Sequence, residues 1–275
     1  MTVPSGSPAA ASTAAAPAAG VFTLDGTPVP FSAGDTLMQA ARRAGAHIPH
    51  LCWHERLGQS GACRVCVVKV NGRFAAACTT PAGNGAVVEN RSAELDARRR
   101  LLVQMLFVEG NHFCPSCEKS GDCLLQATAY DVGMRGPHFE EFYPHRPVDA
   151  SHPTMWLDLN RCILCKLCVR ASREVDGKDV FAIGGHGIGS HLLVNAPSGL
   201  LGDSRFDASD FAAHVCPVGA ILPKRRGFVV PIGERRFDKA TSVHPEPTSV
   251  HPEPTSVRPE PTSVRPEPVE GPGAS

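Results

Sequence analysis

The sequence carries no excess of charge of either sign and no long hydrophobic run. Its 27 Lys and Arg residues balance 27 Asp and Glu residues, so the formal net charge is zero. A neutral chain has no long-range attraction for nucleic acid or for an anionic membrane surface. The longest nearly apolar run, residues 101–108, is far too short to cross a bilayer. These absences exclude membrane insertion and argue against nucleic-acid binding.

The first twenty residues also lack the basic start and the apolar segment of an export signal. Residues 1–19 are rich in Ala, Pro and Ser, which predicts a disordered leader. From Thr241 the chain repeats Thr-Ser-Val-x-Pro-Glu-Pro four times, and two prolines per repeat forbid a helix. We therefore expect a disordered tail over residues 234–275. Because no export signal is present, we expect a cytoplasmic location.

Cysteine is abundant, and its spacing indicates metal binding. The chain has eleven cysteines, an odd number, and several stand in close Cys-x2-Cys pairs. The odd number, the tight spacing and the missing export signal favour reduced thiolates that bind metal over disulfides. Together with one histidine, the cysteines divide into three sets of four ligands, and no cysteine is left over.

The first ligand set has a spacing that favours a 2Fe-2S cluster. Its members are Cys52, Cys63, Cys66 and Cys78. Four thiolates can hold such a cluster, and the Cys63-x2-Cys66 pair matches plant-type ferredoxins. The gap between Cys52 and Cys63 is longer than the corresponding gap in those ferredoxins. A tetrahedral zinc site needs two close pairs, and here there is one.

A histidine-rich stretch beside the first set resembles half of a Rieske site at Cys52-Trp-His54. The other half would need Cys-x2-His, and its second ligand position is occupied by Cys66. We therefore expect the neighbouring histidines to lie near the cluster without binding iron. They are His47, His50 and His54.

The second ligand set combines three cysteines with a histidine. Its members are His112, Cys114, Cys117 and Cys123. Three thiolates cannot complete a 4Fe-4S cluster, so a fourth donor is needed, and His112 is the nearest candidate. A neutral imidazole in place of a thiolate removes one negative charge and raises the reduction potential. The alternative is that His112 is a surface histidine and the cluster has three irons or a water ligand.

The third ligand set gives the most specific signal, and it favours a 4Fe-4S cluster. Its members are Cys162, Cys165, Cys168 and Cys216. The bacterial ferredoxin run Cys-x2-Cys-x2-Cys-x3-Cys-Pro would place its fourth cysteine at Ser172, and that cysteine would serve a second cluster. Cys216 precedes Pro217 but has no cysteine run of its own. We infer one cluster held by the first three cysteines and the distant Cys216.

Short strands and helices are predicted around the first set. Residues 25–26 (Asp-Gly) and 71–72 (Asn-Gly) are hairpin turns between alternating apolar residues. Asp35 is expected to cap a helix whose apolar stripe runs over residues 37–44, and Gly45 is expected to stop it.

A second helix is predicted over residues 93–109, with Ser92 as its N-cap. The three arginines at 98–100 are expected to be solvated, because consecutive side chains splay around a helix. The residues expected on its inner face are Leu102, Met105 and Leu106.

These segments predict an α+β chain in three cluster-bearing parts. Residues 20–98 would form a 2Fe-2S ferredoxin-type domain and residues 139–233 a 4Fe-4S ferredoxin-type domain. Residues 99–138 would form a small helical segment that is too short for a core of its own without metal. No Walker motif, no dinucleotide-binding glycine motif and no Ser/His/Asp arrangement appears, so no catalytic residue is predicted.

Three stretches of the sequence resemble a known family. Residues 109–126, 161–168 and 216–228 closely resemble the diaphorase gamma subunits of NAD-reducing nickel-iron hydrogenases. The likeness covers about residues 20–238, and these subunits are similar to the N-terminal part of the large iron-sulfur subunit of respiratory complex I. A single residue separates His112 from Cys114, a shorter gap than in complex I, which favours the hydrogenase branch.

The resemblance implies a β-grasp 2Fe-2S domain on the first set, a 4Fe-4S site with one histidine and three cysteine ligands on the second, and an ordinary 4Fe-4S site on the third. It also implies partners. Hydride transfer moves two electrons and each cluster accepts one, so a flavin must stand between them, and this sequence has no flavin site. A diaphorase subunit would bind FMN and NAD near the 2Fe-2S cluster, and the small and large nickel-iron subunits would lie at the other end.

The chain alone would not activate hydrogen, because a nickel-iron catalytic subunit needs two further Cys-x2-Cys pairs and no cysteine is spare. It would act as an electron-transfer subunit of a hydrogen:NAD oxidoreductase. One alternative is the equivalent subunit of an NAD-dependent formate dehydrogenase or of a complex I-like NADH dehydrogenase. An alternative of a different class is a structural zinc-binding module.

Metal analysis tests the ligand assignment. Anaerobically purified, reconstituted protein is predicted to be brown and to contain acid-labile sulfide and about ten iron atoms per chain. Iron, sulfide and zinc determinations measure this. A colourless protein that contains zinc would contradict the prediction.

Overall fold

The computed structural model describes residues 19–238. Most of the predicted leader and tail, residues 1–18 and 239–275, lies outside the described residues. Within the described part, no helix has both the length and the apolar character needed to cross a membrane.

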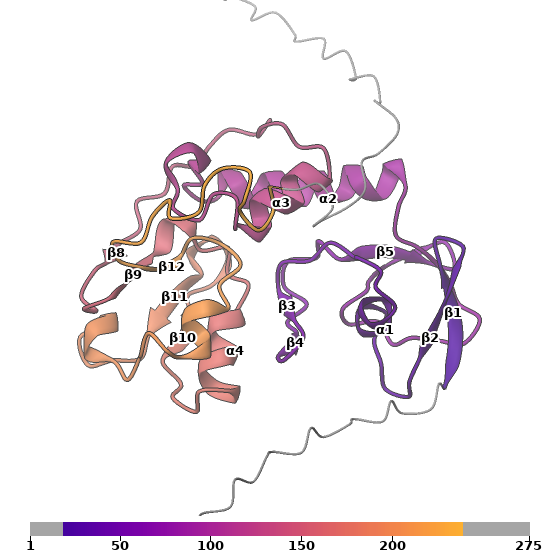
Figure 1. Cartoon of the computed structure of the whole chain (residues 1–275), viewed down its shortest axis with the longest axis horizontal. Helices are drawn as coiled ribbons and strands as arrows, with labels where there is room; N and C mark the ends of the chain where they lie inside the picture. The colour runs from indigo at the N-terminus through magenta and orange to yellow at the C-terminus, as the bar shows by residue number, and fades with distance from the viewer. Residues whose placement is uncertain (1–18, 239–275) are drawn as a thin grey trace, which may run out of the picture. The chain divides into compact units, whose positions relative to one another are not determined.

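The N-terminal part is built on a five-stranded sheet in the order β2-β1-β7-β5-β6. β1 and β7 are parallel, and the other neighbours are antiparallel. Both predicted hairpins are confirmed, and Asp25 and Asn71 take the positive φ that their turns require. Figure 1 shows β1, β2 and β5 around helix α1. The strands are β1 (Gly20–Leu24), β2 (Thr27–Phe31), β5 (Val67–Val70), β6 (Arg73–Ala76) and β7 (Val87–Glu89).

Helix α1 (Leu37–Arg43) begins one residue later than predicted. Thr36, not Asp35, is the N-cap, because its side chain accepts the N–H of Gln39 and forms a capping box. Asp35 instead forms an ion pair with Arg43 at the end of the helix. The predicted stripe is buried from Leu37 to Ala41 but not at Ala44, which already lies past the last helical residue.

The sheet and α1 enclose a hydrophobic core that also contains ligands of the first set. Phe22 and Val29 of the first hairpin and Val68 of β5 are almost fully buried. Cys66, Cys78 and Trp53 belong to the same buried cluster of side chains. The predicted α+β, ferredoxin-like architecture is therefore confirmed in this part, with the candidate cluster site at the edge of its core.

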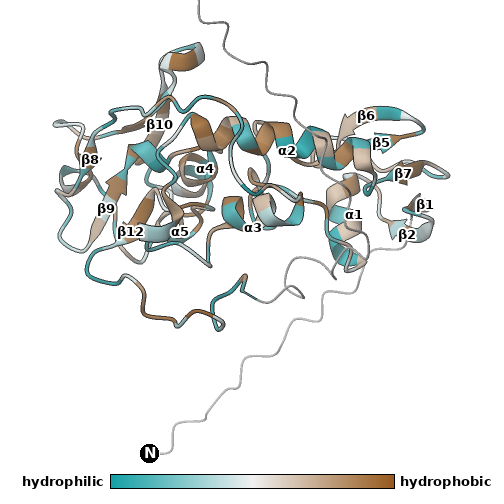
Figure 2. Cartoon of the chain, turned by 90° about the horizontal axis from the view of Figure 1, so that it is seen from above, coloured by the Kyte–Doolittle hydropathy of each residue, from teal (hydrophilic) through white to brown (hydrophobic). Residues whose placement is uncertain are grey.

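Helix α2 (Ala93–Val108) begins at the predicted cap, since Ser92 accepts the N–H of Leu95 at 3.3 Å. Its predicted inner face is correct for Leu102 and Leu106, which pack against a hydrophobic core, and wrong for Met105. Met105 is 43% exposed, whereas Arg99 is 0% exposed, so one of the arginines expected in solvent is buried. The reason is that α2 packs against both β5 and α3 (Leu124–Asp131), and this turns Arg99 and Val103 inward. Figure 2 shows hydrophobic and hydrophilic residues mixed along α2.

The short middle segment shares its core with its neighbours. Leu125 and Ala129 of α3 are buried together with Val103 of α2 and Val218 further along the chain. This segment also contains a 3-10 helix, η1 (Cys114–Ser116). Apolar contacts with α2 and with the C-terminal part thus bury side chains of a segment that is too short to form a core by itself.

The C-terminal part packs a three-stranded sheet, ordered β12-β9-β8, and the hairpin β10-β11 around two short helices. Phe181, Leu157 and Leu201 are buried in its core, together with Cys165 and Cys168. Its elements are β8 (Val148–Asp149), β9 (Met155–Asp158), η2 (Leu159–Arg161), α4 (Leu167–Glu174), β10 (Phe181–Gly184), η3 (Gly187–Gly189), β11 (His191–Val194), η4 (Leu201–Asp203), α5 (Phe211–His214) and β12 (Ile221–Pro223).

Candidate metal centres

All eleven cysteines have free thiols in the structure. Within residues 19–238, no three or more His, Cys, Asp or Glu side chains have the geometry that holds a single metal ion. A cluster of several iron and sulfide atoms is wider than one ion, so its protein ligands stand further apart around a common space. The relevant test for each set is therefore whether its donors converge.

The four cysteines of the first set converge. Cys52 precedes the small strand β3 (Trp53–His54), which pairs with β4 (Gly58–Gln59), and Cys78 follows β6. The N–H of Cys63 donates to the Cys52 Sγ atom at 3.4 Å. Cys78 forms side-chain hydrogen bonds with both Cys52 and Cys66. One continuous group of sulfur atoms therefore joins residues that are far apart in the chain.

Hydrogen bonds between the cysteines of the first set shift their pKa values in opposite directions. Hydrogen bonds from Cys63 and Cys78 lower the pKa of the Cys52 thiol, and the same contact with Cys52 raises the pKa of Cys63. The Trp53 indole N–H is buried and has no hydrogen-bond partner among the protein atoms. A buried unpaired donor is costly, and an inorganic sulfide bound to this set would be an acceptor for it.

The third set lines one enclosed cavity. Cys162, Cys165, Cys168 and Cys216 all face it, and the rest of its wall is mainly apolar, including Ile183 and Leu192. Cys162 follows η2, Cys168 lies in the first turn of α4, and Cys216 follows α5. The fold therefore brings the distant Cys216 to the three clustered cysteines.

The loop that carries the third set has an unusual backbone. Leu164 and Lys166 both have positive φ, 53° and 64°. Such non-glycine positions are strained and concentrate at functional sites. A backbone that alternates between right-handed and left-handed residues turns successive N–H groups toward the same side. The N–H of Leu164 donates to the sulfur of Cys162, and the N–H of Leu167 donates to the sulfur of Cys165.

Burial controls the charge state of the third set. It raises the pKa of Cys162 to about 11 and the pKa values of Cys165 and Cys168 well above the usual thiol value. Four thiolates in this apolar wall are stable only beside a compensating positive charge. Iron supplies that charge, so the donor set fits a metal cluster.

The second set also lines one cavity. His112, Cys114, Cys117 and Cys123 all face it, together with Arg161 and Gly219. Cys114 begins η1 and Cys123 caps α3, so the start of each helix positions one ligand. Arg161 donates to the Cys117 Sγ atom at 3.6 Å. The one histidine and three cysteines that the predicted site requires are therefore gathered in one place.

His112 is buried and is oriented toward the second set. Its Nε2 atom is buried and has no partner, while the ring is hydrogen-bonded to the carbonyl of Leu106. A backbone acceptor on the opposite nitrogen is the usual arrangement for a metal-bound imidazole. Burial lowers the pKa of His112 to about 4, so the ring is neutral near pH 7. These observations contradict the alternative of a surface histidine.

Two glycines leave room for this set. A Cβ atom at Gly110 would lie 2.6 Å from the Nε2 atom of His112, and one at Gly219 would lie 3.2 Å from the Cys117 Sγ atom. The sequence analysis missed both glycines, as well as Arg161, Trp53 and Arg99. Their spacing in the sequence does not indicate a role, because each contacts residues that become its neighbours only when the chain folds.

Substitution of Gly110 tests the space around His112. Gly110→Ala is predicted to displace the imidazole, since 2.6 Å is shorter than any normal carbon-nitrogen contact. The EPR signal of the second cluster is expected to be lost or strongly reduced, with its iron. Gly136→Ala is the control, because no atom lies within 4 Å of its added Cβ. Equal cluster content in the two variants would contradict the prediction.

Substitution of His112 tests the ligand itself. His112→Cys is predicted to retain a cluster with a lowered reduction potential, because a thiolate adds a negative charge that the imidazole lacks. An EPR-monitored redox titration measures the midpoint potential. An unaltered midpoint would show that His112 does not bind iron.

Comparison with known proteins identifies three domains along the chain. A 2Fe-2S iron-sulfur cluster binding domain matches residues 21–93, and a 4Fe-4S single cluster domain matches residues 155–222. The NADH-ubiquinone oxidoreductase-G iron-sulfur binding region matches residues 99–138. The chain therefore carries 2Fe-2S and 4Fe-4S binding domains.

Whole-chain comparisons find relatives of similar length. The gamma subunit of the NAD-reducing hydrogenase HoxS from Cupriavidus necator is 42% identical over 218 residues, which are 79% of this chain and 92% of that subunit. A chain in the crystal structure of an NAD+-reducing nickel-iron hydrogenase in the H2-reduced state has a TM-score of 0.78 and 57% identity, covering 80% of this chain and 94% of that one.

A more distant relative is the 78 kDa subunit of mitochondrial NADH-ubiquinone oxidoreductase from Candida albicans. It is 34% identical over 75% of this chain, but the match spans only 29% of that subunit. The ligand geometry, the three domain matches and the near full-length likeness all support the same family. The chain belongs to the family of gamma subunits of NAD-reducing hydrogenases.

Proposed function

We propose that this chain passes single electrons between a partner subunit that binds FMN and NAD(H) and a nickel-iron hydrogenase module. The observation that carries the proposal is the convergence of three ligand sets in a chain that aligns with 92% of a hydrogenase gamma subunit. The match to the complex I subunit covers only 29% of that protein. The hydrogenase assembly is therefore favoured over the complex I-like alternative.

The ligand assignment within the proposal is one 2Fe-2S cluster on the first set and one 4Fe-4S cluster on each of the other two. Bound clusters supply one-electron redox chemistry, and the protein holds them in a dry, fixed environment. FMN and NAD are assigned to the partner, since hydride must be converted to single electrons there. Eleven free thiols suit a reducing compartment, which supports a cytoplasmic location.

Contacts between the sets support a spatial order that differs from the order along the chain. Cys52 of the first set is packed in the same core as Cys165 and Cys168 of the third. Arg170 of α4 also donates to the carbonyl of Gln59, which lies in β4 between Cys52 and Cys63, at 2.8 Å. The first and third sets are therefore neighbours.

The third set is a neighbour of the second set as well. Arg161, directly before Cys162, donates to Cys117 of the second set. Leu124, directly after Cys123, donates its N–H to the carbonyl of Pro217 at 2.9 Å. We place the third set in the middle of the relay, between the 2Fe-2S site and the histidine-containing second set.

The surface beside the second set supports an exit point at that end of the relay. A cavity of about 500 Å³ adjoins His112 and Cys114. Three aromatic residues of its wall, Phe113, Tyr130 and Tyr143, are each more than 60% exposed. Exposed aromatic side chains are typical of binding surfaces, so we assign this face to the hydrogenase module.

Loss of the middle site tests the relay. Cys165→Ser and Cys216→Ser are each predicted to abolish NAD-linked hydrogen oxidation in the intact complex, because they remove a ligand between the two ends. NADH-dependent dye reduction by the flavin-binding partner is expected to persist. The assays are hydrogen-dependent NAD reduction and NADH-dependent dye reduction.

Lys166→Asn is the matched control. It alters the same loop at an exposed position with positive φ, a conformation that Asn accepts, and it removes no ligand. Wild-type turnover in Cys165→Ser would show that electrons do not pass through this site. Nickel in the purified complex favours the hydrogenase assembly, whereas molybdenum or tungsten favours a formate dehydrogenase.

A further inference from the structure

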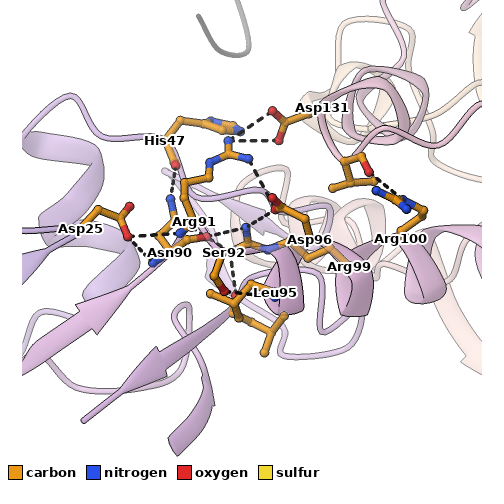
Figure 3. A network of polar contacts seen from close by, with 12 residues as sticks. Asp25, His47, Asn90, Arg91, Ser92, Leu95, Asp96, Arg99, Arg100 and Asp131 are labelled. Atoms are coloured by element: carbon orange, nitrogen blue, oxygen red, sulfur yellow. Dashed lines mark hydrogen bonds and ion pairs between the residues drawn. The ribbon is translucent and has the colours of Figure 1, made fainter. Parts of the chain in front are cut away.

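Arg99 is a fully buried cation that the relay described so far does not use. It lies on α2 and its side chain is 0% exposed. The guanidinium donates to the carbonyl of Asn90 at 2.7 Å, to the side-chain oxygen of Asn90 at 2.8 Å and to the carbonyl of Val67 at 2.7 Å. Figure 3 shows this side chain within a network of polar contacts at the start of the helix.

The protein does not neutralise this charge at short range. All three short hydrogen bonds of Arg99 go to neutral oxygen atoms. Among the described residues, its one ion pair is with Asp96 at 3.5 Å, and that carboxylate is 31% exposed. Asp96 is also shared with Arg91, at 3.8 Å, and the buried carboxylate of Asp131 is paired with the same Arg91 at 3.2 Å. Because isolated buried charges are costly, a further negative group is expected nearby.

The first ligand set supplies that negative group. Val67, whose carbonyl accepts from Arg99, directly follows Cys66. The charged groups that interact with Arg99 are Arg91, Asp96, Asp131 and Cys66, so the first set acts on it together with two carboxylates. Four thiolates around a 2Fe-2S cluster give a net negative charge, which increases by one when the cluster accepts an electron.

We propose that Arg99 is the buried counter-charge of the first cluster and sets its reduction potential. The fixed positive charge stabilises the reduced cluster more than the oxidised cluster, since reduction adds one electron and no proton is needed. The reduction potential is therefore higher than it is without Arg99. This inference rests on the proposed 2Fe-2S assignment and adds a potential-setting residue to it.

A purely structural role is the competing explanation. Arg99 joins β5 to the segment before α2, and Asn90 in turn donates to the carbonyl of His47 at 3.0 Å. A structural role depends on the shape and hydrogen bonds of Arg99, whereas the proposed role depends on its charge. Lys keeps the charge without the guanidinium fork, and Met keeps similar bulk without charge. The two substitutions therefore separate the explanations.

The experiment is an EPR-monitored redox titration of the 2Fe-2S signal in the assembled complex. Arg99→Met is expected to lower the equilibrium constant for one-electron reduction about tenfold, equivalent to about 59 mV. Arg99→Lys is expected to stay closer to the wild type. Arg98→Met is the control, because Arg98 is on the same helix but is half exposed and pairs with Glu94.

Asp96→Asn gives a second measurement that does not depend on the folding of Arg99→Met. It removes the competing carboxylate from a partly exposed position, so the potential is expected to rise. Equal potentials in wild type, Arg99→Met and Asp96→Asn would overturn the proposal. If Arg99→Met loses the cluster, an unchanged reduction potential in Asp96→Asn is by itself enough to overturn the Arg99 proposal.

These outcomes are separable from the proposed relay. The relay proposal fails if hydrogen-dependent NAD reduction persists after loss of the third cluster. This outcome does not depend on the reduction potential of the first cluster. Failure of the Arg99 proposal appears as an unshifted 2Fe-2S midpoint in a complex that still transfers electrons.

Discussion

The structure depends on one constraint, which is that cysteine thiolates inside apolar surroundings require a compensating positive charge. Burial raises the pKa values of Cys165 and Cys168 well above those of ordinary thiols, so these residues are uncharged until a positive partner arrives. Metal binding therefore contributes directly to the folding free energy of each site. The short segment that carries the second set also depends on its neighbours, because it shares its apolar core with α2 and with Val218.

The same constraint explains the backbone around the clusters. Ligand loops must turn tightly and point N–H groups at sulfur, which accounts for the positive φ of Leu164 and Lys166. Close approach also limits side-chain size, as Gly110 and Gly219 show. Contacts of Arg161 and Pro217 make the third set a neighbour of the second. Compact packing thus holds the proposed redox sites close together.

Arg99 shows how a polar network serves both packing and electrostatics. Its guanidinium joins α2 to the sheet through carbonyl oxygens, one of which belongs to Val67, the residue after Cys66. A buried arginine whose neighbouring carboxylates are shared with a second arginine is costly in a protein that binds nothing nearby. Beside an anionic cluster the same residue is stabilising, so its burial is consistent with the proposed 2Fe-2S site.

The sequence by itself determined the ligand types, their spacing and the local turns. Asp25-Gly26 and Asn71-Gly72 specify hairpins because their backbone preferences are local, and Ser92 caps its helix for the same reason. Tertiary structure alone decided which face of α2 is buried, because α2 packs against both β5 and α3 and thereby turns Arg99 inward. It also decided the backbone acceptor of His112 and the proximity of the third set to both others. These features arise from contacts between residues distant in the chain, which local pattern cannot specify.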